Sequence, residues 1–257
     1  MAWSAEQYVK YEDERTRPVR DLIAGIPNSI ARTAVDLGCG PGNSTELLAV
    51  RFPDAEVMGI DNSPEMLAAA RERLPATRFA LDDIADWSRG AGTVDVILAN
   101  ASLHWLPDHA ALMPALLARL NSGGALAVQM PDNLDEPAHR RMREIALLPR
   151  WTDRLAEAGR PRDRGRTAAY YYDLLSPGST RVDVWRTIYH HRMASAAGIV
   201  EWFKGSALIP LLAPLDDGER GDFLAAYLEA ITPDYPAQAD GSVLLPFPRL
   251  FFVATRA

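Results

Sequence analysis

The stretch that decides the fold is AVDLGCGPGNS, residues 34–44 of a 257-residue chain. A short apolar run typical of a buried strand leads into it, and apolar residues at helical spacing follow it. Glycines at positions 38, 40 and 42 let the backbone take conformations closed to other residues and let a ligand approach closely. A glycine-rich turn between a strand and a helix is the context in which such a loop indicates ligand binding.

Strand and helix patterns alternate outward from this stretch, from residue 33 to about residue 130. Ser63 followed by Pro64 is typical of a helix cap and first turn, and Asn43 with Glu46 resembles a capping box. Alternation of this kind implies right-handed crossovers, so we expect an α/β fold with a doubly wound, mostly parallel sheet. The expected strands are Ala34–Leu37, Glu56–Ile60, Arg78–Leu81, Val94–Ala99 and Ala125–Met130.

The ends of the chain add to this plan. Before the sheet we expect helices over about residues 4–14 and 18–24, which either pack against a sheet edge or form a lid over the ligand site. Prolines interrupt residues 131–180, which indicates a helical insert after the fifth strand. We therefore expect one domain, residues 1–257, made of a lid (1–30), a core (31–130), the insert (131–180) and a C-terminal part (181–257). That last part should hold a strand over Val182–His190, helices near Gly198–Leu212 and Asp217–Ala230, and a closing strand near Leu244–Ala254.

Composition argues against several classes of function. A formal net charge of -7 is unsuited to a broad nucleic-acid-binding face, which needs clustered cations. Cys39 is the only cysteine in the sequence, so we expect no intrachain disulfide and no thiolate metal cluster. The sequence has no run of about 18 apolar residues, and its N-terminus is charged where a signal peptide is apolar. We expect a cytoplasmic protein with no membrane span, no nucleic-acid partner and no obligate protein partner.

The spacing of the glycines and the preceding acid separates two kinds of cofactor loop. A nicotinamide-binding loop reads G-x-G-x-x-G, whereas position 43 here is Asn. Asp36 stands two residues before Gly38, and the resulting D-x-G-x-G-x-G pattern resembles motif I of class I S-adenosylmethionine-dependent methyltransferases. The resemblance implies S-adenosyl-L-methionine as cofactor, S-adenosyl-L-homocysteine as product, and a Rossmann-like methyltransferase sheet of seven strands that ends in an antiparallel pair.

Residues at consecutive strand ends are the expected cofactor contacts. Asp36 can hold the cofactor's ammonium, directly or through water, while loop amides around Gly38 and Gly40 contact the cofactor groups next to that ammonium. Asp61 ends the second strand about 20 residues beyond the loop, where a carboxylate accepts both ribose hydroxyls.

Three further positions complete the expected cofactor site. Asn62 could flank the adenine. Asp83 is favoured over its neighbour Asp82 as acceptor for the adenine amino group, because of its position relative to Ile84. Asn100 ends the fourth strand. The run ANASLHW that contains it lacks the Asn/Asp-Pro-Pro-aromatic tetrad of nucleic-acid amino methylases, and no H-E-x-x-H motif indicates a metal.

Longer motifs point to one family. The runs VDLGCGPGNST, GIDNSPEML, ANASLHWLPDH, LAVQMPDN, AYYYDLLS, VDVWRTIYHH and FPRLFFVA span nearly the whole chain and resemble the trans-aconitate 2-methyltransferase family. The resemblance implies methyl transfer to a carboxylate of a small polycarboxylate substrate, giving a monomethyl ester. The basic stretch RPRDRGR departs from the resemblance and is expected to be a solvated loop.

This chemistry needs positioning more than proton transfer. A carboxylic acid with a pKa near 4 is already ionised at neutral pH, so we expect no catalytic general base. The remaining carboxylates need cations and other hydrogen-bond donors, and Arg suits them best. The expected substrate-binding residues, on segments that would rim the carboxyl ends of the strands, are Tyr8, Arg17, His104, Trp105, Tyr171, Arg186, Tyr189 and Arg249.

Some of these assignments have structural alternatives. Arg17 could be a surface ion-pair partner, Trp105 a core residue and His104 a satisfied loop residue. His190 and His191 are consecutive on an expected strand, so they point to opposite faces and only one can face a pocket. Another small acceptor, such as a malonyl thioester carboxylate, an amine or a phenol, also fits the sheet motifs. A non-catalytic S-adenosylmethionine sensor and a nicotinamide oxidoreductase fit them less well.

Overall fold

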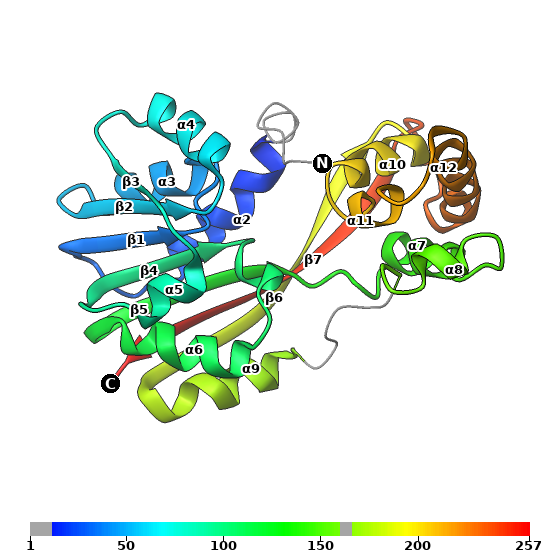
Figure 1. The fold of residues 1–257 in the computed structure, drawn as a ribbon. Coiled ribbons are helices and arrows are strands. Elements are labelled where there is room, and N and C mark those ends of the chain that lie inside the picture. Colours follow the sequence, from blue (N-terminus) through cyan, green and yellow to red (C-terminus); the bar gives the residue numbers. More distant parts are fainter. Residues whose placement is uncertain (1–11, 160–165) are drawn as a thin grey trace. The chain divides into compact units, whose positions relative to one another are not determined.

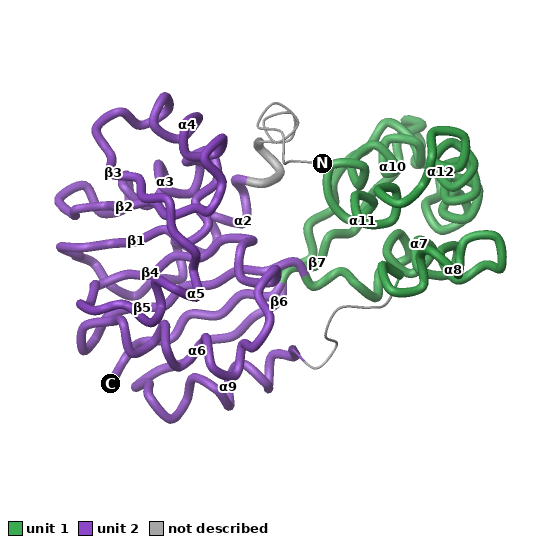
Figure 2. The backbone as a smooth tube through the Cα atoms, in the orientation of Figure 1, with its two compact units in different colours: residues 1–8, 132–164, 188–249 green, residues 9–131, 165–187, 250–257 purple. Residues whose placement is uncertain are grey.

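The computed structural model describes residues 12–159 and 166–257. The chain divides into two compact units, shown in different colours in Figure 2. Unit 1 comprises residues 1–8, 132–164 and 188–249, and unit 2 comprises residues 9–131, 165–187 and 250–257. This division cuts across the expected insert, because residues 165–180 group with the sheet core.

Unit 2 contains the strands and helices that we expected of the cofactor-binding core (Figure 1). Strands β6 and β7 run through both units. The strands are β1 (Thr33–Leu37), β2 (Glu56–Asp61), β3 (Arg78–Leu81), β4 (Val94–Asn100), β5 (Leu120–Pro131), β6 (Ser179–Met193) and β7 (Val243–Arg256). The helices of unit 2 are α2 (Glu12–Ala24), α3 (Asn43–Arg51), α4 (Pro64–Arg73), α5 (Ile84–Arg89), η1 (Leu103–Trp105), α6 (His109–Ala118), α9 (Ala168–Leu175) and η2 (Ser176–Gly178).

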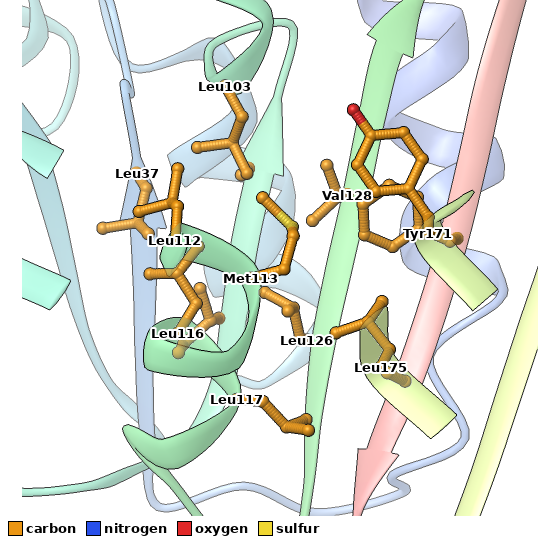
Figure 3. Close-up of a cluster of buried hydrophobic side chains, with 14 of the residues drawn as sticks. Leu37, Leu103, Leu112, Met113, Leu116, Leu117, Leu126, Val128, Tyr171 and Leu175 are labelled. Atoms are coloured by element: carbon orange, nitrogen blue, oxygen red, sulfur yellow. The ribbon is translucent and has the colours of Figure 1, made fainter. Parts of the chain in front are cut away.

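The seven strands form one sheet in the order β3-β2-β1-β4-β5-β7-β6. β1 pairs with β2 and β4, β2 with β3, and β4 with β5, all in parallel. Each expected strand is present, and the predicted doubly wound α/β sheet of seven strands is confirmed. In Figure 3 the arrow of β7 points opposite to that of β5.

Helices cover both faces of this sheet. α3 lies against α4, where Arg73 forms an ion pair with Glu46, while α6 and α9 pack on a cluster of buried apolar side chains (Figures 1 and 3). The cluster joins residues of β1, β4, β5 and β7 to those of the two helices, and burial of such side chains contributes about 1.5–3 kcal/mol each. Its members include Leu37, Ile97, Leu112, Met113, Leu116, Val128, Tyr171, Leu175 and Phe252.

Parallel pairing aligns the ends of the strands that should carry the site. Asp36 of β1 pairs with Gly59 of β2, Asp61 at the end of β2 pairs with Leu81 of β3, and Asn100 at the end of β4 pairs with Gln129. Because parallel strands end at the same edge, these residues share the carboxyl edge of the sheet, where open α/β sheets bind ligands.

The described part of unit 1 holds several helices besides its portions of β6 and β7. His191 stacks on Trp202 with ring centroids 4.9 Å apart, and His139 meets the ring of Phe203 edge-on at 4.9 Å. The helices of unit 1 are α7 (Pro137–Ala146), α8 (Thr152–Leu155), α10 (Ala196–Lys204), α11 (Ile209–Leu212), α12 (Asp217–Ile231) and η3 (Thr232–Asp234).

Two local expectations were wrong. α2 is a single helix that continues through Pro18, where we expected a helix to begin. The helices expected near Gly198–Leu212 are present as α10 and α11. Asn43 does not cap α3, because the N-cap is Gly42, at φ 91° and without a side-chain hydrogen bond. Ser63 does cap α4, accepting from the Met66 N–H with Pro64 in the first turn.

Candidate active site

In the loop after β1, positions 38 and 40 require glycine for two different structural reasons. Gly38 has φ +70°, and a Cβ there would lie 2.3 Å from the Cβ of Ser102, so the close approach of the next loop excludes any side chain. Gly40 has φ +54°, and a Cβ there would meet no heavy atom within 4 Å. Open space beside a left-handed glycine is what a loop needs if a ligand is to lie directly against its backbone.

The amides of this loop are used within the protein. The N–H groups of Gly38 and Cys39 both donate to the carbonyl of Ile60, at 2.8 and 3.0 Å. Gly40 N–H donates to Asp61, and Gly42 N–H donates to the carbonyl of Cys39. These N–H groups therefore donate within the protein, and our expectation that the amides around Gly38 and Gly40 contact the cofactor stays a prediction.

Cys39 packs as a small buried residue of the loop. A Cβ at Gly59 would lie 3.0 Å from its sulfur, and burial raises the pKa of the Cys39 thiol well above its usual range.

Asp36 is a fully buried carboxylate in which one oxygen accepts hydrogen bonds from within the protein. Its Oδ2 accepts hydrogen bonds from the hydroxyls of Ser44 and Thr45, both at 2.7 Å, and these residues belong to the first turn of α3. Its Oδ1 has no hydrogen-bond partner among the described residues. Burial raises the pKa of Asp36 to about 6, although the two hydroxyls lower it in part.

Asp61 ties the end of β2 to the loops on either side. Its Oδ2 accepts from Gly40 N–H at 2.9 Å and its Oδ1 from Ser63 N–H at 2.9 Å. Each carboxylate oxygen has a second lone pair, so the group retains acceptor capacity while its rotamer is fixed. Asn62 beside it is exposed.

The acids after β3 have local structural roles. Asp83 is the N-cap of α5, and its Oδ1 accepts from Ala85 N–H at 2.7 Å. Asp82 accepts from the N–H of Asp83 at 2.9 Å. Both acids and Ile84 are half-buried, and neither contact decides which acid faces an adenine.

The turn after β4 is strained and firmly held. Asn100 has a buried Oδ1 without a partner among the described residues, and Ala101 follows it at φ 53°, a conformation that L residues rarely adopt. The N–H of Ala101 donates to the carbonyl of Gln129 at 2.9 Å, and the hydroxyl of Ser102 donates to the carbonyl of Leu37 at 2.7 Å.

His104 and Trp105 project from the short helix η1 that follows. Their rings lie 4.7 Å apart between centroids, tilted by 41°. Trp105 is 46% exposed, which excludes the alternative that it is a core residue. The β4 turn, residues 100–106, therefore carries an exposed aromatic surface next to an imidazole, at the same edge of the sheet as Asp36 and Asp61.

Comparison with known proteins is consistent with this geometry. A family model described as a methyltransferase domain matches residues 34–124. The trans-aconitate 2-methyltransferase of Paracidovorax citrulli is 54% identical over 256 residues, which cover 99% of this chain and 98% of that protein. The trans-aconitate 2-methyltransferase of Afipia carboxidovorans is 53% identical over 254 residues, 99% of each chain. This chain belongs to the trans-aconitate 2-methyltransferase family.

The fold of this chain is also seen in solved structures of other proteins. The YcgJ protein from Bacillus subtilis matches with a TM-score of 0.61 over 93% of this chain and 98% of that chain. Its sequence is 12% identical, so the match concerns the fold alone. The S-adenosylmethionine-dependent methyltransferase family that we expected from the sequence motifs is confirmed.

The structure separates the predicted substrate residues of this family member by burial and by unit. Tyr171 is 1% exposed and stacks on Phe252, with ring centroids 4.7 Å apart, and Figure 3 shows it within the apolar cluster. Its predicted contact with the substrate stays a prediction. Arg17 and Arg186, also in unit 2, are exposed.

His104 and Trp105 belong to unit 2 as well, whereas the predicted substrate residues Tyr8, Tyr189 and Arg249 belong to unit 1. Tyr189 and Arg249 are buried residues of unit 1, where the Arg249 guanidinium lies 4.9 Å from the ring centroid of Phe247. Tyr8 lies outside the described residues. His190 is exposed and His191 is buried against Trp202, as the alternation of a strand requires.

Sequence reasoning missed His109 and Arg166. His109 is 1% exposed; its Nδ1 lies 2.7 Å from the Tyr171 hydroxyl and its Nε2 lies 2.8 Å from the carbonyl of Leu103. Arg166 donates to the carbonyl of Leu106 at 3.1 Å. The sequence signal at His109 is a helix start, because Asp108 before it caps α6. Nothing in the neighbouring residues indicates that the partner of His109 is Tyr171, 62 positions away.

Among residues 12–159 and 166–257, no group of three or more His, Cys, Asp or Glu is arranged to hold a metal ion. In the same described ranges, every helix is too short or too polar to cross a membrane.

Proposed function

We propose that the chain transfers a methyl group from S-adenosyl-L-methionine to a carboxylate of trans-aconitate, forming a monomethyl ester and S-adenosyl-L-homocysteine. The observation that carries this proposal is the 54% identity, over 99% of the chain, to a protein named for that reaction. The predicted cytoplasmic location and the predicted lack of an obligate protein partner remain expectations.

The residues at the carboxyl edge fit the proposed cofactor. Asp36 Oδ1 and Asn100 Oδ1 are buried acceptors without partners among the described residues, and buried acceptors usually have one. The space beside Gly40, which holds no heavy atom within 4 Å of a Cβ built there, gives room for a ligand against the backbone. An elongated cation that carries several donors suits this set of acceptors.

The roles follow from the chemistry of each group. Asp61 would accept from the ribose hydroxyls through its remaining lone pairs, Asp83 from the adenine amino group with Ile84 beside it, and Asn62 would flank the ring. Asp36 would hold the ammonium, directly or through water, because a positive charge favours its ionised form. When bound, S-adenosylmethionine supplies an electrophilic methyl group on a positively charged sulfur.

The protein's task at the acceptor is alignment. A carboxylate acceptor is ionised at neutral pH, so no residue has to remove a proton. Holding the acceptor in line can contribute roughly 7–11 kcal/mol relative to a reaction between free molecules. We propose that His104 donates to the acceptor and that Trp105 excludes water beside it. Arg17, Arg186, Tyr189 and Arg249 remain predicted partners of the carboxylates that are not methylated.

A labelling experiment tests the proposal. The purified protein is incubated with methyl-labelled cofactor and, separately, trans-aconitate, cis-aconitate, citrate, a malonyl thioester, an amine and a phenol. We expect label in trans-aconitate, released by mild alkali because methyl esters hydrolyse. Alkali-stable label in the amine or phenol, with none in trans-aconitate, would contradict the proposal.

A further inference from the structure

The β4 turn (residues 100–106) is held at both ends of η1 by side chains from outside the cofactor motifs. At its start, the carbonyl of Leu103 lies 2.8 Å from His109 Nε2. At its end, the carbonyl of Leu106 accepts from Arg166 Nη2 at 3.1 Å. The imidazole and the guanidinium also lie together, with Nη1 of Arg166 2.9 Å from Nε2 of His109.

The Nε2 atom of His109 faces two different partners. The carbonyl of Leu103 can only accept and the guanidinium of Arg166 can only donate, so Nε2 donates to Leu103 in one tautomer and accepts from Arg166 in the other. The Tyr171 hydroxyl, 2.7 Å from Nδ1, can donate or accept and fits either tautomer. Arg166 bonds to the turn through Leu106 in both cases.

Arg166 and Tyr171 come from a single segment. Thr167 is the N-cap of α9 and accepts from Tyr170 N–H at 3.2 Å, so the cap that directly follows Arg166 holds the first turn of the helix that carries Tyr171. Tyr171 is anchored further by its stacking on Phe252. We call His109, Arg166 and Tyr171 the turn clamp.

The opposite side of the turn is fixed by the cofactor loop. Ser102 donates to the carbonyl of Leu37, and its Cβ occupies the space that a side chain at Gly38 would need. Ala101 has a positive φ of 53°, a conformation that persists only where the surroundings impose it. The turn that presents His104 and Trp105 is thus held between the cofactor loop and the turn clamp.

We propose that Arg166 and His109 are positioning residues for the acceptor, because they set the placement of His104 and Trp105 through the carbonyls of Leu106 and Leu103. This inference rests on the proposed function, since it assigns the turn to acceptor binding. It predicts that the clamp affects acceptor kinetics and leaves cofactor affinity unchanged. The hydrogen bonds of Asp36 go to Ser44 and Thr45, and Asp61 accepts from Gly40 and Ser63. Asn100 is held in the sheet by its pairing with Gln129.

The kinetic test uses one substitution, one conservative variant and one matched control. Arg166→Met keeps an unbranched apolar stem and removes the donors, whereas Arg166→Lys keeps the charge and one donor group. Arg119→Met is the control: Arg119 ends α6, the helix that His109 begins, and donates to the carbonyl of Gly92 at 2.7 Å, away from the turn.

We expect Arg166→Met to lower kcat/KM for trans-aconitate by about 10- to 100-fold, the range of a lost charge-assisted hydrogen bond. Affinity for S-adenosylhomocysteine should stay within about twofold of wild type. Arg166→Lys should recover part of the loss, and Arg119→Met should keep the wild-type kcat/KM. An equal loss of cofactor affinity in Arg166→Met, or wild-type kinetics in that variant, would overturn the inference.

A spectroscopic readout separates this inference from the proposed function. Protein labelled with 5-fluorotryptophan gives a ¹⁹F resonance for Trp105, assigned by its disappearance in Trp105→Phe. Without any acceptor, Arg166→Met and Tyr171→Phe should shift or broaden this resonance, and Arg119→Met should not. An unchanged Trp105 resonance in both clamp variants would overturn the inference, even if trans-aconitate is a substrate. A shifted resonance with no methylation of trans-aconitate by the wild type would reject the proposed function while supporting the clamp.

Discussion

The carboxylate of Asp61 accepts a hydrogen bond from the backbone N–H of Gly40, with 2.9 Å between Oδ2 and N. This bond joins the end of β2 to the loop after β1, and the second oxygen of Asp61 holds the start of α4 through Ser63 N–H. An acid that is expected to bind a ribose is therefore positioned before any ligand arrives. Such preorganisation reduces the entropic cost of binding.

Asp61→Asn should weaken binding of S-adenosylhomocysteine by about 10- to 100-fold. The amide keeps one acceptor oxygen but removes the charge, and hydrogen bonds to charged groups contribute about 1.5–3 kcal/mol. Isothermal titration calorimetry measures the effect. Asp54→Asn, at an exposed acid that precedes β2, is the control and should bind as the wild type does. Unchanged affinity in Asp61→Asn would show that the ribose lies elsewhere.

Gly38→Ala should mainly reduce stability, and Gly40→Ala should mainly reduce cofactor binding. At Gly38 the new Cβ would lie 2.3 Å from Ser102 Cβ and φ is +70°, so we expect a loss of roughly 2–5 kcal/mol in the free energy of unfolding. At Gly40 only the backbone conformation is unfavourable, which costs about 1–2 kcal/mol, but the methyl group fills the space assigned to the ligand.

Chemical denaturation and ligand titration together check this pair. Ser102→Gly should restore part of the stability of Gly38→Ala, because it removes the clashing Cβ. Gly40→Ala should stay folded and lose cofactor affinity at least about tenfold, the equivalent of about 1.4 kcal/mol. Wild-type affinity in Gly40→Ala would contradict the placement of the ligand against this loop.

Asp36 should make stability fall as the pH rises through the range of about 4 to 6. Its pKa is raised from 3.8 to about 6 by burial, so over that range the folded protein binds more protons than the unfolded chain. The contribution to stability is fully present below pH 3.8 and is lost as the pH approaches 6, and the shift corresponds to about 3 kcal/mol. Asp36→Asn should lack this decline, which urea denaturation at several pH values would show.

The same acid should couple ligand binding to pH. A bound ammonium favours the ionised carboxylate, so affinity for S-adenosylhomocysteine should fall as the pH drops below about 6 in the wild type. Asp36→Asn should bind weakly with a flat pH profile over that range. A variant with wild-type affinity and the same pH profile would exclude Asp36 from ammonium binding.

Arg186→Ala should raise the KM for trans-aconitate at least about tenfold and leave cofactor affinity nearly unchanged, because a guanidinium is well suited to a carboxylate. Arg181→Ala is a matched control: both arginines are exposed on β6, and Arg181 pairs with Asp183. Loss of cofactor binding in Arg186→Ala, or an equal effect of Arg181→Ala on KM, would show that the assignment to the acceptor is wrong.

The sheet could be predicted from sequence because its signals are local. The apolar run that includes Asp36 specifies a strand end. The cap formed by Ser63 and Pro64 specifies a helix start, and the glycines at 38 and 40 specify a backbone conformation. Each of these signals depends only on neighbouring residues. The helix start at Asn43 was misassigned because Gly42, with φ 91°, ends the loop one residue earlier, and Asn43 becomes the first helical residue.

The side-chain partners could not be predicted, because they depend on tertiary packing. Three consecutive tyrosines begin at Tyr170, and only the phase of α9 on the sheet decides that Tyr171 is buried while Tyr172 is 52% exposed. His109 meets Tyr171 across 62 positions of the chain, and Arg166 reaches a carbonyl 60 positions away. The satisfied amides of Gly38 and Cys39 likewise depend on Ile60, on a different strand.

The most direct test of methyl transfer to trans-aconitate is one single-turnover measurement. Wild-type protein is saturated with methyl-labelled S-adenosylmethionine, mixed with trans-aconitate and quenched in acid, and the product is separated and treated with alkali. We expect one labelled methyl group per trans-aconitate consumed, all of it released as methanol by the alkali. Tight binding of S-adenosylhomocysteine with no base-labile label on trans-aconitate at any acceptor concentration would contradict this account.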